Sequence, residues 1–288
     1  MVKIAKSKTK AAKPTAGAAL NQGQDMKTLI CNWTRAILDS GKMSMMTSVR
    51  QTRSIDVVMA IKAGGFDCMF VDLEHGGLSM TEAGQLCIAG LSIGVTPFVR
   101  IPGHEPYLAG QILDLGAMGI IVPHVDTAAD ARLMVDASMY PPVGHRGFSS
   151  TVPQLRFLNW PAAEVRTHIN SQTTVMAQIE TMKAVKNIEA IAAVPGIDMV
   201  VVGSNDLLLD MGIPGQHSHD RLLKALKKVA KGARNQGKHV GIGGGPGPFS
   251  LMKEIYDMGF RLMSVGADTN LLAAAFKASG AEIRRLEP

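Results

Sequence analysis

Acidic and basic side chains recur in this sequence directly after short apolar runs. Glu180 and Asp206 follow VMAQI and MVVVGSN, and Arg100 follows TPFV. Two carboxylates at neighbouring strand ends can hold a hard divalent cation such as Mg²⁺, which completes its coordination with water or substrate oxygens. Each carboxylate could instead cap the helix that follows it, because Asp is favoured at helix starts. The guanidinium of Arg100 suits either an anionic oxygen or a structural ion pair.

Two histidines and one further acid belong to the same set of candidates. His75 follows the run FVDLE, and His124 follows GIIVP. From its type alone, His75 could be a base, a metal ligand or a core histidine. Asp114 lies in the apolar helical stretch QILDLGA, where an unpaired carboxylate is unfavourable. That environment predicts a partner for Asp114, and a histidine is one solution.

These residues need a scaffold that gathers strand ends at one rim. Continuous apolar runs such as MVVVG and GIIVP are typical of strands covered on both faces, and helical segments lie between them. Eight such units favour an α/β fold, a closed (β/α)8 TIM barrel, over an open sheet, with the active site at the carboxyl ends of the strands. We expect strands at Met43–Val49, Phe66–Glu74, Thr96–Ile101, Gly119–Pro123, Thr174–Glu180, Asp198–Asp206, His239–Gly244 and Phe260–Ala267.

Three segments fall outside this repeat. Asp25–Ser40 is expected to form an extra N-terminal helix packed at one end of the barrel. Pro141–Gln172 is a long connection, of the kind often used in function or assembly. Asp268–Leu286 begins with an apolar helical face that either closes the barrel or is covered by a neighbouring subunit. We therefore expect one barrel domain over residues 25–288.

Composition sets the remaining limits. The 288 residues, 46% hydrophobic and 19% charged, have room for one barrel of about 250 residues and short extensions. Five lysines and no acid lie among residues 1–24, which we expect to be a disordered, solubilising tail. A nucleic-acid arm is the less favoured alternative, because aromatic residues and arginine are missing there. Neither a secretory apolar segment nor a membrane span is expected. Cys31, Cys68 and Cys87 fit free thiols in the cytoplasm.

Six stretches together carry a resemblance to a known family. They are GFDCMFVDLEHGGLS, TPFVRIP, QILDLGAMGIIVPHV, YPPVGHRGF, QIET and DMVVVGSNDLLLDMG. In this order they resemble the HpcH/HpaI family of class II, metal-dependent pyruvate aldolases, such as 4-hydroxy-2-oxoheptanedioate aldolase, over roughly residues 44–275. The resemblance implies a phosphoenolpyruvate/pyruvate-type barrel that cleaves or forms the C3–C4 bond of 4-hydroxy-2-oxo acids. It also implies Mg²⁺, Mn²⁺ or Co²⁺ as cofactor and a homohexamer in which the last helix is exchanged between neighbours.

The resemblance assigns roles to particular residues. Glu180 of QIET and Asp206 of GSNDL match the metal ligands. His75 of DLEHGG matches the catalytic base, and Asp114 of QILDLGA matches the carboxylate that orients it. Arg100 of FVRIP matches the arginine that stabilises the enolate oxygen.

Substrate-binding positions follow in the same way. Gly203, Ser204 and Asn205 match the turn whose N–H groups bind the carboxylate of pyruvate. Gln178, near the end of the fifth expected strand, and His124 join the substrate-binding candidates. His124 stands where many members carry a non-titrating residue, and this resembles a relative, macrophomate synthase, which decarboxylates oxaloacetate and captures the enolate.

A second departure leaves the second substrate open. Gly76, Gly77 and Leu78 follow the histidine where the family carries Pro or Asn, which alters the aldehyde pocket. The first hypothesis is an aldolase that acts on pyruvate or oxaloacetate and an aldehyde. The alternatives are an oxaloacetate decarboxylase or macrophomate-synthase-like enzyme and, after these, a non-catalytic binding barrel. No lysine appears at the expected strand ends, which favours class II chemistry over a Schiff base.

Overall fold

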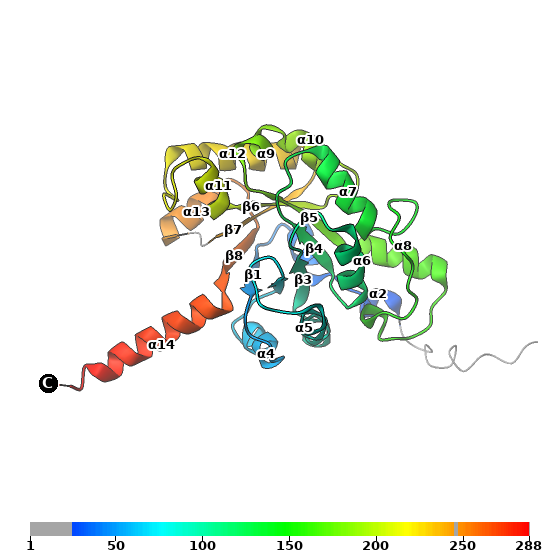
Figure 1. Ribbon diagram of the computed structural model, residues 1–288, viewed down its shortest axis with the longest axis horizontal. Helices are drawn as coiled ribbons and strands as arrows, with labels where there is room; N and C mark the ends of the chain where they lie inside the picture. Colours follow the sequence, from blue (N-terminus) through cyan, green and yellow to red (C-terminus); the bar gives the residue numbers. More distant parts are fainter. Residues whose placement is uncertain (1–24, 245–246, 288) are drawn as a thin grey trace, which may run out of the picture.

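The computed structural model describes residues 25–244 and 247–287, so the expected disordered tail at residues 1–24 lies outside the described residues. Eight parallel strands form a closed barrel in sequence order, and β8 pairs with β1 to complete it (Figure 1). The predicted (β/α)8 barrel is thereby confirmed. The strands are β1 (Ser44–Val49), β2 (Cys68–Asp72), β3 (Thr96–Arg100), β4 (Gly119–Val122), β5 (Thr174–Ile179), β6 (Met199–Gly203), β7 (His239–Gly243) and β8 (Leu262–Ala267).

Helices cover the outside of the barrel. Helix α12 illustrates why they form, because Leu222, Leu226 and Val229 are buried along one side while its lysines face solvent. Two helices follow β5, and two follow β6. The helices that connect the strands are α4 (Asp56–Ala63), α5 (Met80–Ile93), α6 (Pro106–Asp114), α7 (Ala128–Ser138), α9 (Met182–Lys186), α10 (Ile188–Ala192), α11 (Ser204–Asp210), α12 (Asp220–Asn235) and α13 (Phe249–Asp257).

Two hydrophobic cores explain the continuous apolar runs of the strands. Successive strand side chains point to opposite faces of the sheet. In β4, Ile120 and Val122 belong to the core between sheet and helices, whereas Ile121 belongs to the core inside the barrel. Met176 of β5 and Val201 of β6 join Ile121 in that inner core. Both faces of each strand are therefore covered, and no polar face is left to produce alternation.

The expected N-terminal helix is wrong in detail, because the segment forms two short helices, α2 (Met26–Leu29) and α3 (Trp33–Asp39). The buried Asn32 separates them. Its side chain caps α3 and donates through Nδ2 to Gln172 O and Thr174 Oγ1, both at 2.9 Å. The expected packing against one end of the barrel is confirmed, since Thr174 begins β5.

The long connection Pro141–Gln172 contains the 3₁₀ helix η1 (Pro153–Leu155) and the helix α8 (Ala162–Gln172). The buried Gln154 donates to Leu113 O and Ala117 O, 2.7 and 3.0 Å away, just before β4 begins. Leu155 belongs to the inner core. The connection therefore closes the amino-terminal end of the barrel, together with α2 and α3, and lies away from the carboxyl ends of the strands.

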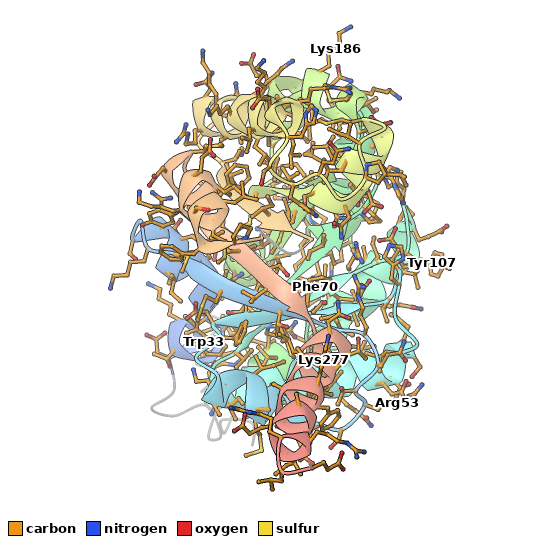
Figure 2. All side chains as sticks on the ribbon, turned by 90° about the vertical axis from the view of Figure 1, so that its left-hand side faces the viewer. Trp33, Arg53, Phe70, Tyr107, Lys186 and Lys277 are labelled. Atoms are coloured by element: carbon orange, nitrogen blue, oxygen red, sulfur yellow. The ribbon has the colours of Figure 1, made fainter. Side chains whose placement is uncertain are left out.

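Helix α14 (Asp268–Arg284) projects away from the barrel (Figure 1). Asp268 is its only buried residue, and the side chain of Phe276 is among its exposed apolar groups, with 72% of the residue exposed. In Figure 2, α14 points toward the viewer and Lys277 lies on it in front of the body of the molecule. Among the described helices, none combines the length and apolar character that crossing a bilayer requires.

The three cysteines are free, as expected. Cys68 and Cys87 are buried and Cys31 is half-buried. Burial raises the pKa of the Cys68 thiol to about 12. A thiol this deeply buried remains protonated and inert, so Cys68 serves packing in β2.

Candidate active site

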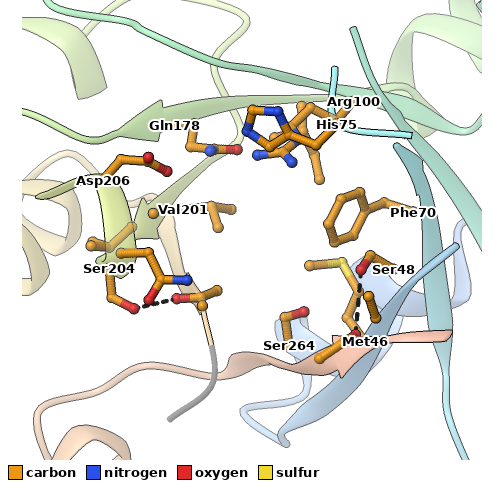
Figure 3. A pocket seen from close by; sticks show the side chains of 18 of the residues that line it. Met46, Ser48, Phe70, His75, Arg100, Gln178, Val201, Ser204, Asp206 and Ser264 are labelled. Carbon is orange, nitrogen blue, oxygen red and sulfur yellow. Dashed lines mark hydrogen bonds between the residues drawn. The ribbon is translucent and has the colours of Figure 1, made fainter. Parts of the chain in front are cut away.

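A cavity of about 300 Å³ lies at the carboxyl ends of the strands. Apolar side chains of the barrel interior form its floor, and polar residues that follow the strands form its rim. Figure 3 shows Asp206 and Ser204 on one side of the cavity, and Phe70 and Ser48 on the opposite side. Arg100 lies along the edge that joins the two sides. The cavity has the size and the mixed lining of a small-molecule site.

Asp72, the last residue of β2, is completely buried and binds two arginines. Arg100 at the end of β3 donates through Nε to Oδ1 at 3.0 Å and through Nη2 to Oδ2 at 2.6 Å. Arg50, which follows β1, donates through Nε to Oδ2 at 2.8 Å. Burial raises the pKa of the Asp72 carboxyl, but the two guanidinium groups outweigh it and hold that pKa below its usual value. Arg100 is buried in the same pair and keeps its charge.

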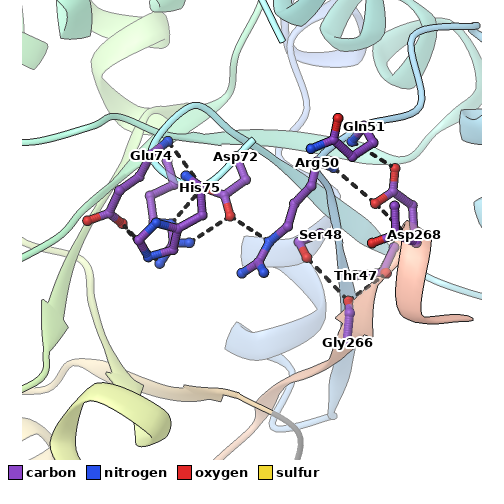
Figure 4. Close-up of polar contacts among 11 residues, drawn as sticks. Thr47, Ser48, Arg50, Gln51, Asp72, Glu74, His75, Gly266 and Asp268 are labelled. Atoms are coloured by element: carbon purple, nitrogen blue, oxygen red, sulfur yellow. Dashed lines mark hydrogen bonds and ion pairs between the residues drawn. The ribbon is translucent and has the colours of Figure 1, made fainter. Parts of the chain in front are cut away.

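Glu74 connects this ion pair to the two histidines, and Figure 4 shows its side chain beside His75. One carboxylate oxygen lies 3.1 Å from Nη1 of Arg100 and 3.8 Å from Nε2 of His75. The other lies 3.0 Å from Nε2 of His124. The oxygen that faces Arg100 is buried and makes no hydrogen bond. Glu74 is thus a shared neighbour of all three cationic or titratable groups.

Glu180 directly follows β5 and is buried. Its Oε2 accepts a hydrogen bond from the backbone N–H of His124 at 2.9 Å, and its Oε1 accepts one from Nε2 of Gln178. Burial raises the pKa of Glu180, and the neighbouring carboxylate of Asp206 raises it further. A Cβ at Gly203 would lie 2.8 Å from Oε1 of Glu180. A side chain at this position would therefore displace the carboxylate of Glu180.

The geometry fits a divalent cation with few protein ligands. Glu180 and Asp206 come from adjacent strand ends and repel each other, and a cation between them would remove that repulsion. Within residues 25–244 and 247–287, no group of three or more His, Cys, Asp or Glu side chains is arranged to hold a metal. Two carboxylates with water or substrate oxygens is the pattern that Mg²⁺ accepts.

The helix-capping interpretation of these carboxylates finds no support. The side chain of Thr181, not of Glu180, caps α9. The expected end of strand six is also wrong: β6 stops at Gly203, and Ser204, Asn205 and Asp206 form the first turn of α11. Asp206 makes no capping hydrogen bond there. The first N–H groups of such a helix have no partner within the helix.

The two histidines differ in how they are held. His124 has a positive φ of 55°, which is uncommon for a non-glycine residue, and its Nδ1 lies 3.4 Å from Oε2 of Glu180. The side chain of His75 is 51% exposed, which contradicts the core interpretation. Its backbone N–H donates to Asp72 Oδ1 at 3.2 Å, and its ring makes no hydrogen bond with any of the described residues. The ring of His75 is thus free to meet a substrate.

Comparison with known proteins decides the family. Residues 51–275 match the family model described as HpcH/HpaI aldolase/citrate lyase. The chain is also 39% identical to the 4-hydroxy-4-methyl-2-oxoglutarate aldolase of Hapsidospora irregularis over 252 residues, 84% of this chain and 91% of that one. This chain belongs to the HpcH/HpaI family. It is therefore a carbon–carbon lyase, as the sequence predicted.

Solved structures agree on the fold of this aldolase. The crystal structure of an HpcH/HpaI aldolase from Desulfitobacterium hafniense superposes with a TM-score of 0.82 at 30% identity, covering 90% of this chain and 98% of that one. Macrophomate synthase has a TM-score of 0.73 at 24% identity, covering 96% of this chain and 100% of that one. At that identity the likeness to macrophomate synthase establishes the shared fold alone.

One predicted contact is wrong for the single chain of the aldolase. Asp114 was expected to orient His75, but its carboxylate accepts a hydrogen bond from Nη2 of Arg146 at 2.6 Å. The physical reason is the direction of the helix. A helix that follows a barrel strand runs back, so Asp114 at the end of α6 lies at the amino-terminal end of β4, whereas His75 follows the carboxyl end of β2. The prediction that Asp114 has a partner is confirmed, but the partner is an arginine.

Two residues of the aldolase site were missed as candidates. Glu74 directly precedes His75, but its contact with His124, 50 positions later, has no signature in the sequence. Arg50 did have a signal: it directly follows the run SMMTSV, as Arg100 follows TPFV. The rule that selects residues at strand ends would have found Arg50 if it had been applied to the first strand.

The buried ion pair leads to a prediction about stability. We expect Asp72→Ala to lower the free energy of unfolding by about 3–5 kcal/mol, because it leaves Arg100 buried without its carboxylate. Urea denaturation followed by circular dichroism measures the change. Asp257→Ala, which removes an exposed carboxylate paired with Lys253, is the control, and its effect should stay below about 1 kcal/mol. Equal losses in the two variants would contradict a central role for Asp72.

Proposed function

We propose that this chain is a divalent-cation-dependent aldolase that cleaves and forms the C3–C4 bond of 4-hydroxy-2-oxo acids. The observation that carries the proposal is that Asp206 and the buried Arg100 line one cavity at the strand ends, while the carboxylate of Glu180 is buried beside Asp206 and Gln178. The name of the Hapsidospora irregularis relative supports the substrate class. Residues 25–288 act as a single catalytic barrel in this proposal.

The residues divide the chemistry between the two halves of the substrate. The cation held by Glu180 and Asp206, Mg²⁺ or a similar ion, supplies Lewis-acid charge beside the 2-oxo group. The N–H groups of Gly203 to Asn205 bind the carboxylate of the 2-oxo acid, with Gln178 beside it. Arg100 is locked by Asp72, so its charge is already in place where negative charge develops on the enolate oxygen.

The proton and electrons follow a balanced path. His75 accepts the proton of the C4 hydroxyl as the C3–C4 bond breaks, and C4 becomes the carbonyl of the released product. The bonding pair moves into the 2-oxo acid and forms its enolate, which takes up a proton at C3 to give pyruvate. No lysine lines the cavity among the described residues, so the same residues do not support a Schiff base.

His124 favours a second candidate function, the decarboxylation of oxaloacetate. Its ring lies between Glu74 and Glu180, and its φ of 55° holds it at the edge of the cation site. Decarboxylation generates the same enolate without a base for a hydroxyl proton. A group at the position of His124 is well placed to deliver a proton to that enolate.

The cation site predicts metal-dependent enolisation. With Mg²⁺ in D₂O, the wild-type protein should exchange the methyl protons of pyruvate, and EDTA should stop the exchange. Glu180→Gln and Asp206→Asn should each lose most of it, because each removes anionic charge from a two-carboxylate site. Asp210→Asn changes an exposed acid on the same helix and should retain exchange. Proton NMR measures the rates, and full exchange by the wild type in EDTA would refute metal dependence.

The histidine separates the two reactions. His75→Ala should reduce aldol cleavage by about 10²–10⁴-fold, the usual effect of losing a general base. It should affect oxaloacetate decarboxylation much less, because loss of CO₂ itself forms the enolate. Arg100→Ala should depress both reactions. Coupled assays with one enzyme preparation and one metal provide the comparison. Equal losses in both reactions for His75→Ala would assign that histidine to the metal site or the fold.

We also propose that the protein is a homo-oligomer, a hexamer, in which a neighbouring copy covers α14. Leu271, Leu272, Phe276 and Ile283 are 40–72% exposed on this helix, an unfavourable arrangement for an isolated chain. Phe276→Asp should therefore yield smaller species than the wild type in light scattering. Lys277→Asp introduces the same acid one position later and should keep the assembly. A wild-type monomer at micromolar concentration would refute the proposal.

A further inference from the structure

Arg50 is fixed in place by three separate contacts (Figure 4). Its backbone N–H donates to Asp268 Oδ1 at 3.1 Å, and its backbone carbonyl accepts from Gly77 N at 2.9 Å. Its side-chain Nε donates to Asp72 at 2.8 Å. Asp268 also accepts from the next two backbone N–H groups, at 3.2 and 2.8 Å, which holds the whole start of the loop after β1.

The glycines that follow His75 make this arrangement possible. A Cβ at Gly76 would meet the backbone carbonyl of Asp72 and lie 2.8 Å from the carbonyl oxygen of Arg50. The loop after β2 therefore passes so close to the loop after β1 that only glycine fits at this position. The departure Gly76–Gly77, noted in the sequence, is what allows Arg50 to approach the site.

The end of the Arg50 side chain is left free. Its two terminal Nη groups make no hydrogen bond or ion pair with any described residue, although Nε is paired. Arg50 lines the cavity, and 36% of its side chain is exposed. The second arginine on Asp72, Arg100, differs in this respect, because its Nε, Nη1 and Nη2 all face carboxylates. Arg50 thus presents an unused, positively charged edge to the cavity.

The position of Arg50 in the barrel indicates which part of a substrate it meets. Strand β1 lies across the closed barrel from β5, which carries Glu180, and Ser48 of β1 lies opposite Asp206 in Figure 3. A 2-oxo acid held at the Glu180 and Asp206 side therefore extends its C4 end past Arg100 toward β1. Arg50 lies where the group attached to C4 would be.

We infer that Arg50 binds a second carboxylate, attached to C4 of the substrate, so that the preferred substrates are 4-hydroxy-2-oxo dicarboxylates whose released half is itself a 2-oxo acid. This assignment rests on the proposed aldolase function and names its substrate class. A guanidinium whose two Nη groups are free matches a carboxylate with two parallel, charge-assisted hydrogen bonds. A neutral aldehyde would leave that edge unpaired.

Substrates that share the pyruvate half test the assignment. These are 4-hydroxy-2-oxoglutarate and 4-hydroxy-4-methyl-2-oxoglutarate, with a carboxylate on C4, and 4-hydroxy-2-oxopentanoate, with a methyl group there. Wild-type kcat/KM should favour the dicarboxylates. In Arg50→Met, the ratio of dicarboxylate to monocarboxylate kcat/KM should fall by about 10- to 100-fold, mainly through KM, because hydrogen bonds to a charged group are lost.

Arg53→Met is the matched control. Arg53 lies on the same loop and carries the same charge, but it pairs with Glu82 at 2.8 Å, is 59% exposed and does not line the cavity. The ratio of dicarboxylate to monocarboxylate kcat/KM in Arg53→Met should equal that of the wild type. An Arg50→Met variant that loses activity equally on all three substrates, or on none, would overturn the assignment.

Failure of the proposed function has a different signature. A wild-type protein that exchanges pyruvate protons but prefers the monocarboxylate retains the aldolase function and overturns the role of Arg50. A wild-type protein that neither exchanges pyruvate protons nor cleaves any of the three substrates overturns the aldolase function and, with it, the substrate class.

Discussion

The buried carboxylate of Asp72 is the interaction on which the site depends. It is completely buried and accepts hydrogen bonds from Arg100, Arg50 and two backbone N–H groups of the following loop. One side chain therefore sets the orientation of two cations and the course of the loop that carries His75. An isolated charge could not be buried here, since removing it from water is strongly unfavourable unless partners replace the water. Asp72 needs both arginines as partners, and its hydrogen bonds fix their side chains in turn. The positive charge at the cavity is therefore in place before any substrate binds.

A second electrostatic relation balances the first on the opposite side of the cavity. There burial raises the pKa of Glu180, and the neighbouring carboxylate of Asp206 raises it further. Acidic groups that repel each other at one edge and guanidinium groups at the other give the cavity a polarity. A cation satisfies the first edge, and an anionic oxygen satisfies the second. This arrangement of charges suits a 2-oxo acid whose C3–C4 bond breaks, because the electrons of that bond move into the 2-oxo group and form an enolate.

Most of the barrel could be predicted from the sequence, because apolar runs covered on both faces and helices ending at glycine are local signals. Apart from the end of β6, the strand ends were predictable for the same reason, and with them the positions of Glu180 and Arg100. The predictions that failed depended on the direction in which a helix runs or on hydrogen-bond partners far away in the sequence. Asp114 is the last residue of α6, so it lies at the amino-terminal end of the barrel, far from His75, and Arg146 is its partner. The break at Asn32 reflects bonds to Gln172 and Thr174, about 140 residues away, which no local pattern records.

The division into two cores has a consequence for how such a protein can diversify. The inner core is closed at its amino-terminal end by η1, α2 and residues of the long connection, whereas the cavity is built on the loops at the opposite end. Changes in the loops after β1 and β2 alter which aldehyde or oxo-acid acceptor is bound, and they leave the packing at the amino-terminal end unchanged. Acceptor preference can therefore change through short replacements in these loops, while the packing at the amino-terminal end of the barrel stays the same. At the cavity end, by contrast, a change at Arg50 also touches the buried Asp72, so specificity and stability are coupled there.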